Sequence, residues 1–528
     1  DADGSAALPN TRGVLIRDSQ SNQIGGEPNV ISGNLREGIK IFGSSTNNVV
    51  GGNHIGTNAA GDEAVGNDTG VRISGLASAN TIGGTAAADR NVISGNVDEG
   101  LLLAADNNTV SGNFIGTNAT GTAALGNDEG VLIYNTADIL IGGVADGSGN
   151  VISGNEGDGI RITGKKSANN TIAGNLIGTN AAGDAAIGNK QGIRLESVNN
   201  TIGGDASGAG NVISGNSING IILRVGAGGT TIAGNRIGLN AAGNGDIANR
   251  VGVLIEHTAD NTVGGTAAGA GNSIGGNTQQ GIKITGAAAS GNHIRGNAIG
   301  FDRQTGTVVA NLDGVRITEG ASDNSIGGTQ AGAENEIAHN TRIGVWIGGG
   351  TGNAVLHNSI HDNGELGLAV DSRLVTANDA DDADAGANNL QNFPEFGAVT
   401  LGNGSLTIAY SVPSTLDNSA FPLSVEFFAA DSNDQEGQTF LGSHSYSAIG
   451  PATANIPAGA AGIGTRIVAT ATDALGNTSE FSAAATVASP LLAAGGASGQ
   501  TSSAGHQPLT SAELLTTVDA AISRLGEA

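Results

Sequence analysis

The sequence predicts an all-β protein whose first three-quarters is a right-handed parallel β-helix of about twelve three-strand coils. A short apolar motif, Gly-[Ile/Val/Leu]-x-[Ile/Leu/Val], recurs along this part of the chain. A second block, Asn-Val-Ile-Ser-Gly-Asn, returns about 60 residues apart. The composition of the 528 residues, with 90 glycines and 3% aromatics, favours a repeat protein because each narrow layer needs only a few Ile and Val residues to fill it.

The short motif sets the length of one coil. Its starts lie 23 to 33 residues apart, which gives twelve intervals, at Gly13, Gly38, Gly70, Gly100, Gly130, Gly159, Gly192, Gly220, Gly252, Gly281, Gly314, Gly344 and Gly367. Each interval holds three segments of three to five residues in which apolar and polar residues alternate, the period of a β-strand. Strands this short need parallel stacking, coil on coil, to bury their aliphatic residues and pair their backbone.

Asparagine opens most second and third strands, and we expect its side-chain amides to form ladders along the axis. The positions on which this rests are Asn80, Asn91, Asn108, Asn170, Asn200 and Asn211. The loops alternate between two kinds, as in 56–62 after a third strand and 203–210 before one. We therefore expect loops of one kind to project from one side of the solenoid in every second coil.

These motifs resemble the right-handed parallel β-helix repeats of the pectin-lyase-like superfamily, and in particular large secreted bacterial surface proteins of that type. The resemblance rests on Asn-Val-Ile-Ser-Gly-Asn, Gly-Ile-x-Ile-x-Gly and Asn-Asn-Thr-Ile-x-Gly-Asn-x-Ile-Gly-Thr, and covers about residues 13–394. It implies a fold, and leaves the activity open, because that superfamily holds lyases, hydrolases, epimerases, adhesins and scaffolds. The polygalacturonase signatures and the Asp-Pro-His-Glu signature of alginate epimerases are absent from the solenoid.

The repeat motifs end before residue 397 and longer apolar segments follow, so the sequence predicts four parts. The β-helix covers 1–396, and a small antiparallel β-sandwich covers 397–488, with strands expected at 406–412, 423–428, 466–471 and 481–487. The stretch from Ala469 to Phe481 resembles the last hairpin of bacterial immunoglobulin-like modules. An Ala/Gly/Ser-rich linker is expected at 489–508 and an amphipathic helical tail at 509–528.

Charge and composition exclude several classes of partner. The formal net charge is −26, which repels nucleic acid and anionic membranes and suits divalent cations. No apolar run is long enough to span a membrane, and cysteine is absent, which removes disulfides and thiolate chemistry. Composition leaves the redox compartment open, and the resemblance to large secreted bacterial surface proteins implies a secreted or cell-surface protein.

The residue between the two aliphatics of the short motif points out of the sheet, so one row of side chains lines the rod. This outward row contains Leu15, Lys40, Arg72, Leu102, Leu132, Arg161, Arg194, Ile222, Leu254, Lys283, Arg316, Trp346 and Ala369. We interpret this surface as a groove for an acidic polysaccharide. The ligand-binding candidates are Arg161, Arg194, Lys283, Arg316 and Trp346 of this row, with Arg224 and Tyr134 of the next outward row, two residues further along each strand. Two other interpretations stay open: a solvated ladder in which arginines and glutamates neutralise one another, and an apolar face that packs on another protein.

Histidines gather late in the solenoid. Aligning 335–340 with 358–363 places His339 over Asp362 and His361 beside them, with His357 just before. Such a group of side chains can transfer protons or bind a metal ion. The alternative is that these residues have no such role and mark the last coil of the solenoid, since terminal repeats usually depart from the repeat pattern. The sequence therefore assigns no catalytic residue, and the candidates for such a role are His339, His357, His361 and Asp362.

The segment after the solenoid carries Asp379, Asp381, Asp382 and Asp384, an alternation of oxygen ligands that fits Ca²⁺. It lacks the full EF-hand pattern, and acidic runs are commonly just solvated. We expect a bound calcium ion to tie the end of the solenoid to the sandwich.

The first ten residues align with the interior of a long loop, so the chain begins within a coil. Either residues upstream have been removed, or coils of a neighbouring molecule complete this open edge in a head-to-tail homo-oligomer. Together these features predict an extracellular structural or adhesive surface or matrix protein that presents its solenoid to glycans or to its own copies. The alternative is a polysaccharide lyase or hydrolase that acts on acidic glycans.

Overall fold

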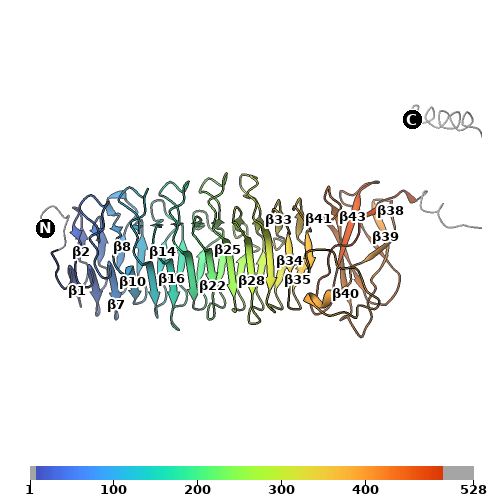
Figure 1. The fold of residues 1–528 in the computed structure, drawn as a ribbon, viewed down its shortest axis with the longest axis horizontal. Coiled ribbons are helices and arrows are strands. Elements are labelled where there is room, and N and C mark those ends of the chain that lie inside the picture. The colour runs from blue at the N-terminus through green and yellow to red at the C-terminus, as the bar shows by residue number, and fades with distance from the viewer. Residues whose placement is uncertain (1–7, 491–528) are drawn as a thin grey trace, which may run out of the picture. The chain divides into compact units, whose positions relative to one another are not determined.

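The computed structural model describes residues 8–490, and it confirms the predicted right-handed parallel β-helix (Figure 1). Three parallel sheets run the length of the solenoid. The first sheet consists, in spatial order, of β1 (Val14–Arg17), β4 (Ile39–Phe42), β7 (Val71–Ser74), β10 (Glu99–Ala104), β13 (Glu129–Tyr134), β16 (Asp158–Thr163), β19 (Gln191–Glu196), β22 (Asn219–Leu223), β25 (Val251–Glu256), β28 (Gln280–Thr285), β31 (Asp313–Thr318), β34 (Val345–Ile347) and β37 (Leu368–Val370).

The second and third sheets hold twelve strands each. The second consists of β2 (Gln23–Gly25), β5 (Val49–Gly51), β8 (Thr81–Gly83), β11 (Thr109–Ser111), β14 (Leu140–Gly142), β17 (Thr171–Ala173), β20 (Thr201–Gly203), β23 (Thr231–Ala233), β26 (Thr262–Gly264), β29 (His293–Arg295), β32 (Ser325–Gly327) and β35 (Ala354–Leu356). The third consists of β3 (Val30–Ile31), β6 (His54–Ile55), β9 (Val92–Ile93), β12 (Phe114–Ile115), β15 (Val151–Ile152), β18 (Leu176–Ile177), β21 (Val212–Ile213), β24 (Arg236–Ile237), β27 (Ser273–Ile274), β30 (Ala298–Ile299), β33 (Glu336–Ala338) and β36 (Ser359–His361).

The core of the solenoid is a column of aliphatic side chains. Ile160 and Ile162 of β16 stack on Ile193 and Leu195 of β19, and all four are fully buried. Each such side chain contributes about 1.5–3 kcal/mol by leaving water, which is how strands of two to six residues are held.

Asparagine ladders run along the corners, as predicted. In one of them Asn150 Nδ2 donates to Asn175 Oδ1 at 2.9 Å, and Asn113 Nδ2 donates to Asn150 Oδ1 at 3.0 Å. A further ladder, from Asn34 to Asn363 at the corner before the first sheet, was not among the predicted positions. The ladders pair backbone and amide groups that the turns would otherwise leave buried and unsatisfied.

The residues after the solenoid form two antiparallel sheets. One has the order β38 (Glu395–Gly402), β39 (Ser405–Ser411), β42 (Ala452–Pro457), and the other β41 (Gly437–Tyr446), β40 (Leu423–Ala430), β43 (Arg466–Thr472), β44 (Ala485–Thr486). Two 3₁₀ turns, η1 (Ala87–Asp89) and η2 (Ala387–Leu390), complete the regular structure. Three of the predicted strands match β39, β40 and β43, whereas the fourth is reduced to β44, and β38, β41 and β42 were not predicted. An immunoglobulin-like topology stays a prediction.

The sandwich caps the last coil (Figure 1). Phe428, Val468 and Phe481 join the solenoid core, and side chains of the sandwich accept backbone N–H groups that a further coil would otherwise have paired. These bonds are His357 N to Glu426, Asn363 N to Glu436, Val370 N to Glu480, Val355 N to Thr478 and Gly352 N to Asn477. Contacts within residues 1–488 make the two modules one compact unit.

The predicted linker, from residue 491 on, and the whole predicted helical tail lie outside the described residues. In the described part of the chain, no helix has the length and apolar character needed to cross a membrane.

Candidate functional site

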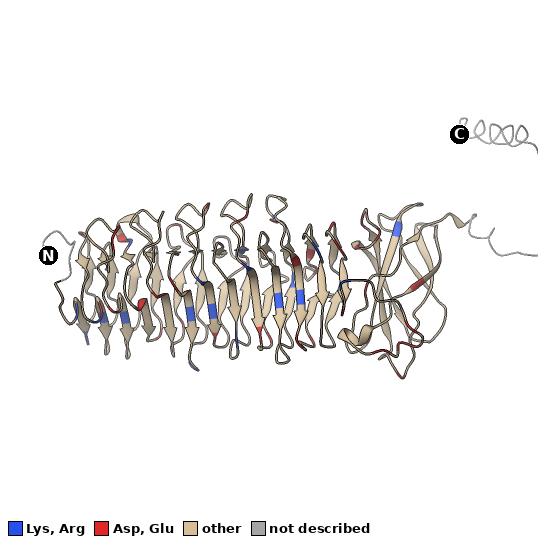
Figure 2. Ribbon diagram, viewed as in Figure 1, with Lys and Arg blue, Asp and Glu red and all other residues tan. Residues whose placement is uncertain are grey.

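The outward row of the first sheet is in the predicted register along its whole length. Arg161 pairs with Arg194 on the next strand, Lys283 with Arg316, and Arg316 with Trp346. Figure 2 shows the bases recurring on the strands of this sheet. The row is therefore a physical feature of the surface.

Acidic neighbours neutralise the middle of this row. Arg161 Nη1 lies 3.0 Å from Glu129 Oε1 and its Nη2 lies 3.3 Å from Glu196 Oε2, while Arg194 also binds Glu196. Arg224 Nε lies 2.8 Å from Glu256 Oε2. These arginines thus form the charge-balanced ladder that was one of the open interpretations.

A row of acidic residues immediately precedes the glycines that open the short apolar motif, and this row was not predicted from the sequence. Glu37 holds Arg12 at 2.7 Å and Lys40 at 3.0 Å. Burial alone would raise the pKa of Glu37, but the hydrogen bonds from Lys40 and Arg12 outweigh it and lower the pKa to about 2. Burial raises the pKa of Glu129. The signal was visible as the recurring pair Glu-Gly at 37–38, 99–100 and 129–130.

The end of the outward row nearest the sandwich is different. The guanidinium of Arg316 lies 4.0 Å from the ring centroid of Trp346, and within residues 8–490 neither Lys283 nor Arg316 has an ion-pair partner. Tyr134, which is 48% exposed, lies with Lys165 and Lys166 at a separate hollow of about 550 Å³. The ligand-binding candidates of the first sheet therefore fall into a neutralised group and two smaller cationic groups.

A second surface, which we call the loop groove, lies over the third sheet. Beneath it lies the row of residues that alternates with the buried isoleucines: Val30, His54, Val92, Phe114, Val151, Leu176, Val212, Arg236, Ser273, Ala298, Glu336 and Ser359. The loops cover part of this row, since Val92, Val212 and Ala298 are buried. Loops before and after the third-sheet strands form its two walls.

Each wall is continuous because its loops stack across every second coil (Figure 1). The first wall consists of the loops that follow third-sheet strands. In it, Ala119 N donates to Gly61 O at 2.8 Å, Ala181 N to Gly121 O at 2.9 Å and Ala241 N to Gly183 O at 2.8 Å. The second wall consists of the loops that precede third-sheet strands. The backbones of neighbouring loops approach so closely there that a Cβ at Gly147 would collide with the carbonyl oxygen of Thr85. The predicted projection of one loop type from one side is thus what builds the groove.

Two cavities lie in the loop groove, and each is lined by an arginine. A cavity of about 740 Å³ lies over Phe114, Val151 and Leu176 and holds Arg90, whose guanidinium lies 4.3 Å from the Phe114 ring centroid. A cavity of about 420 Å³ lies over Glu336 and Ser359 and holds Arg303. Arg90 Nε and Arg303 Nη2 donate to backbone carbonyls, and neither arginine has an ion-pair partner within residues 8–490.

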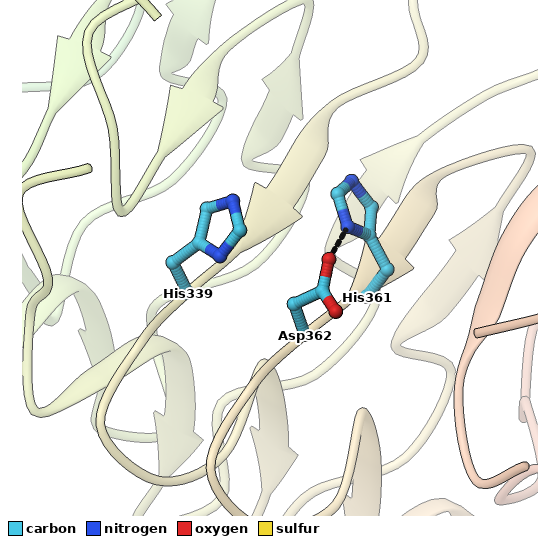
Figure 3. A group of neighbouring side chains, drawn as sticks. All are labelled: His339, His361 and Asp362. Carbon is cyan, nitrogen blue, oxygen red and sulfur yellow. Dashed lines mark hydrogen bonds and ion pairs between the residues drawn. The ribbon is translucent and has the colours of Figure 1, made fainter. Parts of the chain in front are cut away.

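The predicted histidine group lies beside the smaller cavity. His339 and Asp362 occupy equivalent corners of successive coils, with φ of 61° and 54°, and the His361 ring lies 5.8 Å from that of His339 (Figure 3). His361 Nδ1 lies 2.8 Å from Asp362 Oδ2, and its Nε2 lies 3.6 Å from Glu336 Oε1. The structure therefore brings together three of the four candidates, and adds Glu336.

The same contacts shift the pKa values of the group. The carboxylate of Glu336, 3.6 Å from Nε2, together with the contact with Asp362, raises the pKa of His361 despite its burial, and the proximity of His361 lowers the pKa of Glu336. His357 lies elsewhere: its Nε2 binds Glu426 Oε1 at 3.1 Å, and its ring lies 4.1 Å from that of Phe440. His357 thus belongs to the contact with the sandwich.

The predicted calcium ligands come together in part. Ligand atoms of Asp379, Asp382 and Asp384 lie within 4.8 Å of one another, without Asp381. Asp382 is buried, and both of its oxygens already accept hydrogen bonds, from Asn392 N, Gln391 Nε2, Ser414 Oγ and Ser419 Oγ. Within the described residues, 8–490, the buried Oδ1 atom of Asp384 has no hydrogen-bond partner. Burial, together with the nearby Asp379 and Asp382, raises the pKa of Asp384. The orphaned oxygen fits a cation, and a calcium ion here stays a prediction.

No family model matches this sequence, and no curated protein matches it. Similar solved structures include the periplasmic alginate epimerase AlgG (a double mutant; 15% identity, 64% of this chain and 70% of that chain, TM-score 0.37). They also include the A-module of the Azotobacter vinelandii mannuronan C-5 epimerase AlgE6 (18% identity, 70% and 87%, TM-score 0.35) and the Dettilon tailspike protein (14% identity, 76% and 71%, TM-score 0.32). At these identities the likeness is confined to the parallel β-helix fold, which the three sheets of this chain already display.

Proposed function

We propose that this protein works outside the cytoplasm and acts on an acidic polysaccharide, as a lyase or hydrolase that binds the polymer in the loop groove. One observation carries the proposal. Within residues 8–490, Arg90 and Arg303 line separate cavities and form no ion pair, although Glu336 lines the cavity of Arg303. Arg161 and Arg194, by contrast, are paired with acids. Unpaired guanidinium groups in a chain of net charge −26 suit an anionic ligand.

The spacing of the two cavities along the solenoid suits a polymer. The strands that carry Phe114 and Glu336 are seven positions apart in the third sheet, a span of about 34 Å. Between its two walls a chain laid parallel to the solenoid axis would meet both arginines. Glu336, on the floor of the smaller cavity, is the candidate proton acceptor, with Arg303 placed to face the carboxylate of a uronic-acid unit.

The experiment combines binding and product analysis. We expect Arg90→Gln and Arg303→Gln each to weaken retention of pectate or alginate in affinity electrophoresis by about tenfold or more, and Arg250→Gln, an exposed arginine outside the groove, to leave it unchanged. Reducing-end and unsaturated-product assays with the same polymers test the reaction. Equal retention by all three variants would contradict the groove, and absence of product from every acidic polymer would contradict the enzyme.

A second candidate function is the structural or adhesive one, in which the solenoid displays a glycan-binding face without turnover. The Arg316–Trp346 pair favours it, because a flat aromatic ring beside an unpaired cation suits a sugar that carries an acid group. In that case Trp346→Ala would abolish retention of the polymer while Arg303→Gln would not.

A head-to-tail assembly would have to join the first coil to the sandwich, since Glu426, Glu436 and Glu480 already cover the last coil.

A further inference from the structure

We propose that His339, His361 and Asp362 form a binding site for a divalent transition-metal ion of the zinc class, at the edge of the smaller cavity of the loop groove. One ligand atom from each of the three side chains lies within 4.8 Å of the other two. The site is separate from the carboxylate set at Asp379, and its occupancy is measurable whether or not the protein acts on a polysaccharide.

The backbone builds this site from two coils. Ala338 pairs with His361 between β33 and β36, so the residue after Ala338 lies over the residue after His361. Both corner residues, His339 and Asp362, adopt a left-handed conformation, which turns their side chains toward one space (Figure 3). His361 completes the group from the strand itself and is only 9% exposed.

The ring of His361 is oriented as a metal-bound imidazole is. Its Nδ1 faces Asp362 Oδ2 at 2.8 Å, and its other nitrogen, Nε2, faces Glu336 Oε1 at 3.6 Å. Metal-binding histidines characteristically donate their second ring N–H to a carboxylate, which fixes the tautomer and strengthens the ligand. An ion would take the place of the proton between Nδ1 and Asp362, and that proton would leave to solvent.

The donor set selects the class of ion. Two imidazole nitrogens and one carboxylate oxygen suit Zn²⁺ and its neighbours, whereas Ca²⁺ and Mg²⁺ prefer sites made of oxygen alone. Three protein ligands leave a position for water or a ligand from the groove, as in open zinc sites. Glu336 is a positioning residue here: it lines the cavity and holds His361, and it lies outside the proposed ligand set.

The test uses the full chain, freed of metal by a chelator and titrated with Zn²⁺ or Co²⁺. We expect one ion at this site by elemental analysis, and a Co²⁺ absorption spectrum typical of nitrogen ligands. His339→Asn and Asp362→Asn should each abolish both signals, and since Asn tolerates positive φ, the corners should keep their shape. Glu336→Gln should weaken Zn²⁺ binding by about 10–100-fold.

Two matched controls locate the ion. His293→Ala removes an exposed imidazole on the second sheet, and Asp384→Asn alters the other carboxylate set, so both should bind Zn²⁺ as the unaltered chain does. Zn²⁺ binding that survives both His339→Asn and Asp362→Asn, with circular dichroism showing an intact fold, would overturn the proposal. A Co²⁺ complex without nitrogen ligands would do the same.

Discussion

The carboxylate of Glu480 accepts the backbone N–H of Val370 at 2.9 Å, and so takes the place of the carbonyl that a further coil would supply. The same side chain accepts Thr376 N at 2.7 Å. The last strand of the first sheet is therefore completed by an acidic side chain of the sandwich, which makes the end of the solenoid sensitive to proton concentration.

Burial raises the pKa of Glu480 to about 7 from an ordinary value of 4.5. The pKa of Glu480 is higher in the folded chain than in the unfolded chain, so the protonated side chain favours the folded state. The contribution of Glu480 to the free energy of unfolding is therefore fully present below about pH 4.5 and is lost as the pH rises through 7. The loss amounts to about 3 kcal/mol. Glu480→Gln, which stays neutral, should flatten the fall of the urea midpoint between pH 5 and 8, and the exposed Glu63→Gln should not. Identical pH profiles for Glu480→Gln and the unaltered chain would show that Glu480 does not titrate in this range.

The asparagine ladder should be costly to interrupt. Asn150→Ala removes the acceptor of Asn113 N and Asn113 Nδ2, and the donor to Val110 O and Asn175 Oδ1, all of them buried. We expect a loss of about 3 kcal/mol or more in the free energy of unfolding, measured by urea titration. Asn244→Ala, at an exposed loop position, serves as the control. A loss below 1 kcal/mol would mean that water replaces the ladder.

Glu196 holds two arginines at once, Arg161 and Arg194. Glu196→Gln should therefore uncover a cationic patch on the first sheet. We expect stronger, salt-sensitive retention of polyanions in affinity electrophoresis, with a loss of about 1 kcal/mol or less in stability because the pairs are partly exposed. Unchanged retention at low salt would indicate that Glu129 and Asp158 suffice to neutralise the row.

Calcium should raise the thermal midpoint if it occupies the set at Asp379, Asp382 and Asp384. At a hundredfold excess over the dissociation constant the gain is about 2.7 kcal/mol. Asp384→Asn should remove the calcium response and leave the midpoint in chelator nearly unchanged, since Asp384 Oδ1 has no partner. A response that persists in Asp384→Asn would place the ion elsewhere.

The register of the outward row could be predicted because side chains alternate strictly along a strand. That rule placed Arg316 beside Trp346 and Arg161 beside Arg194. It failed for Glu129, which by strict alternation would share the inward face of Val131. The Glu129 side chain is only half-buried and its carboxylate binds Arg161. Alternation is a property of regular strands and says nothing about their ends.

The histidine group was predictable for a related reason, and only in part. Aligning two repeats placed His339 over Asp362, since equivalent positions of successive coils stack. The partner of His357 is Glu426, which lies on a strand of the sandwich that no repeat aligns with the solenoid. The cavities of the loop groove were missed as well, because their shape depends on how whole loops stack and not on any single side chain.

The hydrogen bonds between the wall loops skip one coil each time, from Gly61 to Ala119, from Gly121 to Ala181 and from Gly183 to Ala241. A change of length by a pair of coils keeps this pattern of contacts, whereas a single coil inserted between two such loops would separate them. Each pair adds about 10 Å to the rod. Duplication or deletion of one such pair in the gene would then lengthen or shorten the loop groove in fixed steps, while the remaining loops could keep the same kind of contact.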